Sequence, residues 1–263
     1  MILLLGGTSE TAPLATALGG AGLKVLVSTA TDVALHVGDH PNVIRRAGVL
    51  DCERMHRLVV ELDIKLIVDA SHPYSAEASE NARRTAAELG VSYVRWERPP
   101  ALERGEPVIF RQSHELAAET ACSFGLPVLL TTGSRNLIPY VAAASRAGVE
   151  LFVRVLPHAD SIEVCRSAGI PERNILSGRG PFSVEENVET LRRFHIGVLV
   201  TKDSGVAGGV PAKIEAARIH GCRVVVVARP ENITHATFSD VRELVSAVCR
   251  ALSRPSPDLA PST

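Results

Sequence analysis

The chain has 263 residues, of which 46% are hydrophobic and 22% are charged, and its formal net charge is −1. This ordinary globular composition argues against disorder, and the near-neutral charge gives no overall positive field to attract nucleic acid or an anionic membrane surface. Aromatic residues make up only 4%, so base-stacking platforms are not expected either.

Signals for export, membrane insertion and metal binding are weak. The apolar run at residues 1–5 is too short for a signal peptide, and no other run approaches the ~20 residues of a membrane span. The five cysteines are scattered without a CxxC pair, which argues against disulfides, zinc and iron–sulfur clusters. His36 and His40 lack a third ligand in place, so we expect no metal. The sequence favours a cytoplasmic protein with reduced thiols.

In the first part of the chain, short apolar runs alternate with helical patterns. The predicted strands are residues 2–5, 24–28, 43–45, 66–69 and 92–95. The predicted helices are residues 10–18, 52–62 and 75–89, the last closed by Gly90 as a left-handed cap. This alternation predicts a parallel sheet with helices on both faces.

A Pro- and Gly-containing segment at 99–107 breaks the pattern and is the predicted linker. The strands expected after it are residues 108–110, 128–130, 151–155, 174–176, 198–200 and 224–227. Helices are expected to begin at Ser113, Asp160, Ser183 and about Val210, with a last helix near 239–252. Asp160 and Ser183 each stand three residues before a glutamate, which is capping-box spacing. We therefore expect two α/β domains, residues 1–98 and 108–252, and a disordered tail at 253–263.

Ligands of open parallel sheets bind beyond the carboxyl ends of the strands. Small, hydroxyl and basic residues follow the strands of both predicted sheets. If these two edges face each other, they form a shared cleft.

Residues 6–10, Gly-Gly-Thr-Ser-Glu, lie between the first strand and the first helix. Glycines there let the backbone approach a phosphate, and the helix N-terminus supplies N–H donors. The segment departs from G-x-G-x-x-G because Thr8 and Thr11 occupy the second and third glycine positions. Its place after the first strand favours nucleotide binding, with a tight turn that binds nothing as the alternative.

Residues 28–30, Ser-Thr-Ala, end the second strand, where an acidic residue would bind the ribose 2′-hydroxyl of NAD. Hydroxyl groups tolerate a 2′-phosphate, so the segment favours NADPH, although no arginine follows immediately. The alternative is that Ser28 and Thr29 only cap a turn. After the strand at 66–69, His72 could donate or accept a proton at neutral pH, or it could order its loop.

Basic residues gather near the strand ends of the second half. They are Arg135, Arg179, Lys202, Lys213 and Arg229. Several cations converging on one edge of a near-neutral protein suggest a polyanionic ligand, although solvated surface charge is the usual fate of such residues.

Nine short segments occur along the chain in a specific order. They are LGGTSE at 5–10, DASHPY at 69–74, RWERP at 95–99, TTGS at 131–134, RVLP at 154–157, GRGPFS at 178–183, TKDSG at 201–205, Lys213 with EAAR at 215–218, and RP at 229–230. Together they resemble the precorrin-6A reductase family of cobalamin biosynthesis. The resemblance implies two Rossmann-like domains and NAD(P)H-dependent reduction of a macrocycle double bond of precorrin-6A, giving precorrin-6B. The substrate would be a tetrapyrrole edged with carboxylates, which fits the basic edge.

The resemblance also gives expected roles to residues. The expected cofactor contacts are Gly6, Gly7, Thr8, Ser9, Glu10, Ser28, Thr29, Ala30, Ser71, Pro73 and Arg98. The expected substrate contacts are Thr132, Gly133, Ser134, Arg135, Arg179, Gly180, Lys202, Ser204, Lys213 and Arg229. The proton donor could be His72, Tyr74 or water. One alternative function is a cobalt-precorrin-6A reductase that uses NADH. A more distant alternative is a non-catalytic NADP(H)-sensing module, which would not need the basic edge.

Overall fold

The computed structural model describes residues 1–30, 36–97, 101–102, 108–229 and 236–253. The chain divides into two compact units. The first unit combines Met1–Pro99 with Glu231–Thr263, and the second is Pro100–Pro230. In the described part of the chain, no helix combines the length and the apolar character needed to cross a membrane.

The first unit is built on a parallel sheet with the strand order β12-β5-β4-β1-β2-β3. Its strands are β1 (Ile2–Leu5), β2 (Val25–Thr29), β3 (Val43–Ala47), β4 (Leu66–Asp69), β5 (Ser92–Trp96) and β12 (Thr237–Phe238). Its helices are α1 (Thr11–Gly20), α2 (Cys52–Glu61), α3 (Ala76–Leu89) and α9 (Val241–Ser253). The order reverses at β1, which has β2 on one side and β4 on the other. A ligand crevice is expected at such a switch point.

The fully apolar strand β1 explains why helices cover both faces of this sheet. Successive side chains of a strand point to opposite faces. Ile2 and Leu4 pack with α1 and α9, whereas Leu3 and Leu5 pack with α2 and α3.

The predicted helix cap is also confirmed, since Gly90 ends α3 with φ 65°.

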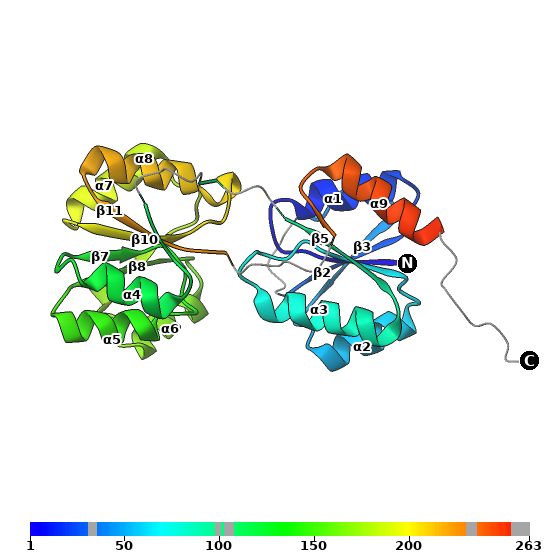
Figure 1. Ribbon diagram of the computed structural model, residues 1–263, viewed down its shortest axis with the longest axis horizontal. Coiled ribbons are helices and arrows are strands. Elements are labelled where there is room, and N and C mark those ends of the chain that lie inside the picture. Colours follow the sequence, from blue (N-terminus) through cyan, green and yellow to red (C-terminus); the bar gives the residue numbers. More distant parts are fainter. Residues whose placement is uncertain (31–35, 98–100, 103–107, 230–235, 254–263) are drawn as a thin grey trace, which may run out of the picture. The chain divides into compact units, whose positions relative to one another are not determined.

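The C-terminal segment corrects the predicted domain boundary. We expected 108–252 to form one domain, but β12 pairs with β5 and α9 packs on α1 in the first unit. Figure 1 shows α9, in orange and red, beside the blue α1. The physical reason is burial, because Leu244 and Val248 of α9 complete the apolar cluster that Trp96 of β5 also joins.

The second unit repeats the architecture with the strand order β6-β11-β10-β7-β8-β9, again parallel. Its strands are β6 (Ile109–Arg111), β7 (Val128–Leu130), β8 (Leu151–Val155), β9 (Ile175–Ser177), β10 (Val198–Lys202) and β11 (Arg223–Val227). Its helices are α4 (His114–Cys122), α5 (Ile138–Ala147), α6 (Ala159–Ser167), α7 (Val184–Arg193) and α8 (Val210–His220), with short 3-10 turns η1 (Glu172–Asn174) and η2 (Val206–Gly208). Helices α7 and α8 cover one face of the sheet and α4, α5 and α6 the other (Figure 1). The expectation of two parallel α/β sheets is confirmed.

Local capping signals were predictive in part. The capping box of α7 is confirmed, because Ser183 N–H donates to Glu186 Oε2 at 2.7 Å and Glu186 N–H donates to Ser183 Oγ at 3.1 Å. The capping box expected at Asp160 is wrong, since α6 begins after His158 with no side-chain cap. Helix α5 was not predicted, although proline in its first turn and Gly148 after its end are typical helix boundaries.

The predicted linker is partly packed. Leu102 is buried in the core of the second unit, and Ala101 N–H donates to Asp203 Oδ1 at 3.1 Å. These two residues therefore belong to the second unit. The remainder of the expected linker and residues 254–263 of the expected tail lie outside the described residues.

Candidate functional site

The loop between β1 and α1 is shaped by Thr11. The side chain of Thr11 is buried, and its Oγ1 accepts hydrogen bonds from the N–H groups of Gly7 and Thr8 at 3.0 and 3.1 Å. Thr8 Oγ1 in turn donates to the carbonyl of Ala70, at 3.3 Å, just beyond β4. The threonine at the third glycine position of the fingerprint thus organises the loop, which lies at the switch point between β1 and β4.

Gly6 gives the loop no room for a side chain. A Cβ atom at Gly6 would come within 2.5 Å of Thr11 Cγ2, and Gly7 has φ +109°, a conformation that favours glycine. We expect Gly6→Ala to displace Thr11 and to destabilise the protein by about 1–3 kcal/mol. Urea unfolding would measure this loss. Gly20→Ala is the control for destabilisation, since nothing lies within 4 Å of a Cβ atom there. Equal stability of the two variants would contradict the packing argument.

Two arginines reach the end of β2 from the neighbouring strand. Arg46 Nη1 donates to Ser28 Oγ at 2.8 Å, and Arg45 Nη2 donates to Thr29 Oγ1 at 3.2 Å. Burial and the nearby Arg54 lower the pKa of Arg46, which is consistent with a concentration of positive charge. The sequence interpretation looked for an arginine directly after β2 and missed this pair. The signal was present as two adjacent arginines in the strand that pairs in register with β2.

A buried ion pair supports the loop after β4. Asp69 and Arg95 are almost inaccessible, and their side chains approach to 2.6 Å. Tyr93 Oη donates to Asp69 Oδ2 at 2.8 Å. Arg95 Nη1 also donates to Ser71 Oγ at 3.1 Å, and Arg95 Nη2 donates to the carbonyl of Ser71 at 3.2 Å. The pair thereby fixes the start of the loop that carries His72.

His72 and Tyr74 lie close together in that loop. His72 Nδ1 accepts a hydrogen bond from Tyr74 N–H at 3.3 Å, and the two ring centroids are 5.7 Å apart. With Nδ1 as the acceptor, a neutral His72 carries its proton on Nε2. Pro73 between them is buried. Arg98, another expected cofactor contact, lies outside the described residues.

In the second unit, a cavity of about 300 Å³ opens where β7, β8 and β9 end. Three expected substrate contacts line it, namely Gly133, Gly180 and Lys213. Arg154 and Phe182 also line it, and the sequence interpretation had assigned neither of them to the site. The other expected substrate contacts are not part of its wall.

The remaining expected substrate contacts have varied surroundings. Arg179 and Arg135 are exposed. Arg229 Nε donates to the carbonyl of Asp203 at 2.8 Å, and its Nη2 lies 3.3 Å from Asp203 Oδ1. Among the described atoms, Thr132 Oγ1 is buried without a hydrogen-bond partner. Ser204 Oγ lies against Gly208, since it would clash with a Cβ atom there, and Ser134 is half-buried.

A second polar cluster surrounds His114 at the start of α4. His114 Nδ1 lies 2.9 Å from Tyr140 Oη, and His114 Nε2 lies 3.1 Å from Asn136 Nδ2. Burial and the positive charge of Lys202 lower the pKa of His114 to about 4. Burial and Arg135 also lower the pKa of Lys202. His114 is therefore neutral at pH 7 and can accept or donate hydrogen bonds without adding charge.

This pKa has a consequence for stability. The folded-state pKa of His114, about 4, lies below its ordinary value of about 6.5, so protonation favours the unfolded chain. We expect the free energy of unfolding to fall as the pH is lowered from 6.5 to 4. The slope should be smaller in His114→Gln, as measured by urea unfolding at several pH values. Titration of the His114 ring near pH 6.5 in an NMR experiment would contradict the prediction.

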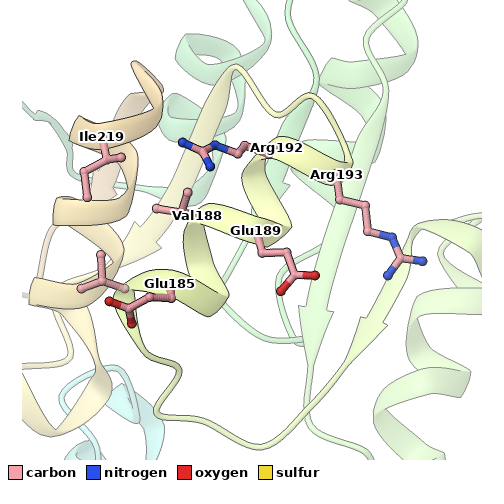
Figure 2. Close-up of a pocket in the computed structure, with 7 residues that line it drawn as sticks. Glu185, Val188, Glu189, Arg192, Arg193 and Ile219 are labelled. Atoms are coloured by element: carbon pink, nitrogen blue, oxygen red, sulfur yellow. The ribbon is translucent and has the colours of Figure 1, made fainter.

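A larger cavity, of about 620 Å³, lies between α7 and α8. Its wall consists of Val184, Glu185, Val188, Glu189, Arg192, Arg193 and Ile219, all carried by these two helices (Figure 2). None of these residues follows a strand, so the cavity is separate from the strand-end segments. In the described part of the chain, no group of three or more His, Cys, Asp or Glu side chains could hold a metal ion.

Comparison with known proteins decides the family. A family model described as precorrin-6x reductase CbiJ/CobK matches residues 1–249. The chain belongs to this family. It is an oxidoreductase that acts on a CH–CH group in cobalamin biosynthesis. The resemblance noted in the sequence is confirmed, and the alternative of a non-catalytic sensing module is excluded.

Individual relatives agree with the assignment of the reductase. The cobalt-precorrin-6A reductase of Priestia megaterium is 35% identical over 249 residues, covering 94% of this chain and 98% of that protein. The precorrin-6A reductase of Rhodococcus erythropolis is 32% identical, covering 87% of this chain and 89% of that protein. A solved structure of CobK precorrin-6A reductase has a TM-score of 0.73 at 23% identity, covering 97% of this chain and 98% of that chain. This last likeness confirms the fold of the reductase.

Proposed function

We propose that the reductase binds NADPH in its first unit and reduces a macrocycle double bond of precorrin-6A to give precorrin-6B. The observation that carries the choice of cofactor is the pair Arg45 and Arg46 at the end of β2, where a nucleotide bound at the switch point places its ribose. A carboxylate there would favour NADH, and the described end of β2 carries hydroxyls and guanidinium groups instead.

The residues of the first unit fit such a nucleotide. Gly6 leaves the backbone of the β1–α1 loop without a side chain, and α1 begins directly after this loop, which is the geometry that receives a pyrophosphate. Successive strand residues point to opposite faces, so one of the two pairs, Ser28 with Arg46 or Thr29 with Arg45, would face the adenosine ribose and its 2′-phosphate. When bound, NADPH supplies the hydride. The protein then has to position the nicotinamide ring against the macrocycle and exclude water.

Reduction of the double bond also requires a proton, for which we propose His72. Its Nε2 carries the proton when Nδ1 accepts from Tyr74 N–H, and the Asp69–Arg95 pair fixes the loop. We expect His72→Ala to lower kcat by about 10²-fold or more with little change in KM for NADPH. Tyr74→Phe is the comparison for a role of the neighbouring hydroxyl. Unchanged turnover of His72→Ala at every pH would assign the proton to Tyr74 or water.

The second unit would hold the carboxylate-edged macrocycle. The expected substrate contacts remain our proposal for this surface, with Gly133, Gly180 and Lys213 at its centre because they share one cavity. Cobalt-precorrin-6A is a second candidate substrate, because relatives of 31–35% identity carry that name. The cobalt would be held by the macrocycle itself and leave no ligand set on the protein.

The deciding experiment is anaerobic absorbance spectroscopy of the purified reductase with precorrin-6A, with NADPH and NADH added in separate runs. Cofactor oxidation matched by a spectral change of the macrocycle supports the proposal, and the faster cofactor fixes the preference. If the enzyme reduced cobalt-precorrin-6A but not precorrin-6A, the cobalt-bearing macrocycle would be the substrate. Turnover with NADH alone would overturn the cofactor assignment. We also propose that the enzyme is cytoplasmic, because its five cysteines are scattered along the sequence without the spacing typical of a disulfide framework.

A further inference from the structure

Two positively charged side chains share the small cavity of the second unit. Arg154 comes from β8 and Lys213 from α8, and both line the cavity of about 300 Å³. Burial lowers the pKa of each of them, and the charge of Arg154 lowers the pKa of Lys213 further. Like charges that are withdrawn from water and repel one another are unfavourable unless an anion joins them.

Arg154 is held in one position by two neighbours, Asn187 and Phe182. Its Nη1 donates to Asn187 Oδ1 at 2.7 Å, and its guanidinium carbon lies 4.4 Å from the centre of the Phe182 ring. Asn187 is buried and also donates to the carbonyls of Phe182 and Ser183, at 3.3 and 2.7 Å. The guanidinium is therefore fixed before any ligand arrives, which reduces the entropy lost on binding.

The surrounding groups do not neutralise these charges. The negative charge of Glu186 in α7 favours the charged form of Arg154. The Glu186 carboxylate, however, also accepts a hydrogen bond from Ser183 N–H in the capping box of α7. Lys213 Nζ donates to a neutral group, the carbonyl of Gly208 in η2, at 3.1 Å. Between β8, α7, η2 and α8, the described charges that act on the pair are those of Arg154, Lys213 and Glu186. The net charge of this group is positive.

The shape of the cavity limits what can enter. Four glycines line it, namely Gly133, Gly178, Gly180 and Gly208. At Gly178 a Cβ atom would come within 2.8 Å of Phe182 Cζ, so glycine is what allows this ring to pack under Arg154. A volume of about 300 Å³ is at the lower end of the range for small-molecule sites. It accommodates an acid arm of a macrocycle, and the ring itself would lie outside.

We propose that Arg154 and Lys213 form a subsite that binds one carboxylate arm of the substrate and so fixes the rotation of the macrocycle. The proposal rests on the proposed function and adds a specificity-determining pair to it. The planar guanidinium matches a carboxylate in a bidentate geometry, and the ammonium provides a second charge.

Binding of the arm should take up a proton at alkaline pH. Burial, together with Arg154, lowers the pKa of Lys213 to about 8 in the free protein, and a bound carboxylate favours the ammonium form. Below pH 8 Lys213 is already charged, so affinity is constant. Above pH 8 binding has to protonate Lys213 first, and KM for the macrocycle should rise by up to about tenfold per pH unit.

The test compares Arg154→Gln and Lys213→Met with Arg146→Gln, an exposed arginine in the last turn of α5. We expect each subsite variant to raise KM for the macrocycle at least about tenfold at pH 7, with KM for NADPH unchanged and the control like the wild type. Lys213→Met should also abolish the rise of KM above pH 8. Thermal unfolding checks that each variant is folded.

Two results would overturn the inference while leaving the function in place. One is a folded Arg154→Gln variant with wild-type KM for the macrocycle, and the other is the same alkaline rise of KM in Lys213→Met. If Arg154→Gln is unstable, Arg154→Lys provides the test, because it keeps the charge and loses the bidentate fork. Failure of the wild type to reduce either macrocycle would count against the proposed function. In that case, NMR titration of Lys213 with and without precorrin-6A tests the subsite alone, and an unchanged Lys213 pKa would reject it.

Discussion

Replacement of Asp69 by alanine is expected to lower the free energy of unfolding by about 3–5 kcal/mol. The carboxylate of Asp69 is fully buried and pairs with Arg95, which is itself only 2% exposed. Without the carboxylate, the guanidinium would remain buried with an uncompensated charge, and Tyr93 Oη would lose its acceptor. Urea unfolding monitored by circular dichroism measures the effect. The variant should also bind NADPH more weakly, because Arg95 fixes Ser71 at the start of the His72 loop.

Two comparisons separate the buried charge from other causes. Glu53→Ala removes an exposed carboxylate of α2 that pairs with Arg57 and should change the unfolding transition little. The double variant Asp69→Leu with Arg95→Met removes both charges and should recover much of the stability lost by Asp69→Ala. A double variant as unstable as the single one would show that the carboxylate acts through the loop alone.

The same ion pair sets a pH dependence in acid. Burial alone would raise the pKa of Asp69, but Arg95 and the hydrogen bonds from the serines outweigh it, and the pKa lies below its ordinary value of 3.8. A depressed carboxyl pKa contributes stability that is present above the unfolded-state value and is lost as the pH falls through the folded-state value. The contribution of Asp69 is therefore complete at neutral pH and is lost only below pH 3.8.

Simultaneous replacement of Arg45 and Arg46 by alanine is expected to raise KM for NADPH about 30- to 100-fold and to leave KM for NADH nearly unchanged. A hydrogen bond to a charged group contributes about 1.5–3 kcal/mol, and about 1.4 kcal/mol corresponds to a factor of ten. The two guanidinium groups lie at the hydroxyls of Ser28 and Thr29, which point to opposite faces of the sheet, so the double variant removes whichever of them a 2′-phosphate at the end of β2 would contact. Steady-state kinetics with each nucleotide measures the change.

A matched control for this pair is Arg57→Ala. Arg57 is an exposed residue of α2 that pairs with Glu53, so its removal changes the charge of the same unit away from β2. This variant should retain the wild-type KM values for NADPH and NADH. If the double variant raised KM for NADPH and NADH equally, the arginines would bind a group common to both nucleotides, and the basis for NADPH specificity would be lost.

The sequence predicted strand positions well because buried parallel strands are short, continuous apolar runs. The strands at 2–5, 66–69, 128–130 and 151–155 have the predicted bounds, and the other predicted strands are displaced by at most two residues. The two-residue strand β12 was missed, since it has too few residues to show a pattern. Helix α9 was found, but an amphipathic pattern reports that a face is buried without stating which sheet covers it.

The sequence predicted candidate site residues only where their position after a strand in the chain is enough to locate them. Loops after strands were found by their position, and this gave Gly6 and His72. Lys213 was found in the helix that follows the loop after β10. The pairs Arg45 with Ser28 and Arg95 with Asp69 join neighbouring strands that are far apart in the sequence, so their contacts depend on strand order and register. Arg154 was missed as a site residue because it lies inside a buried strand, and only the cavity beside it distinguishes its role.

The return of the chain to the first unit through β12 also sets an order for synthesis. All strands of the second unit lie between residues 109 and 227, so this unit is complete in sequence before β12 and α9 leave the ribosome. Until then, the edge of β5 and the apolar face of α1 lack their partners. Domains generally fold as units during translation, and unpaired strand edges are prone to aggregation. The nascent chain thus exposes an unfinished N-terminal sheet for the whole time that the later unit is translated.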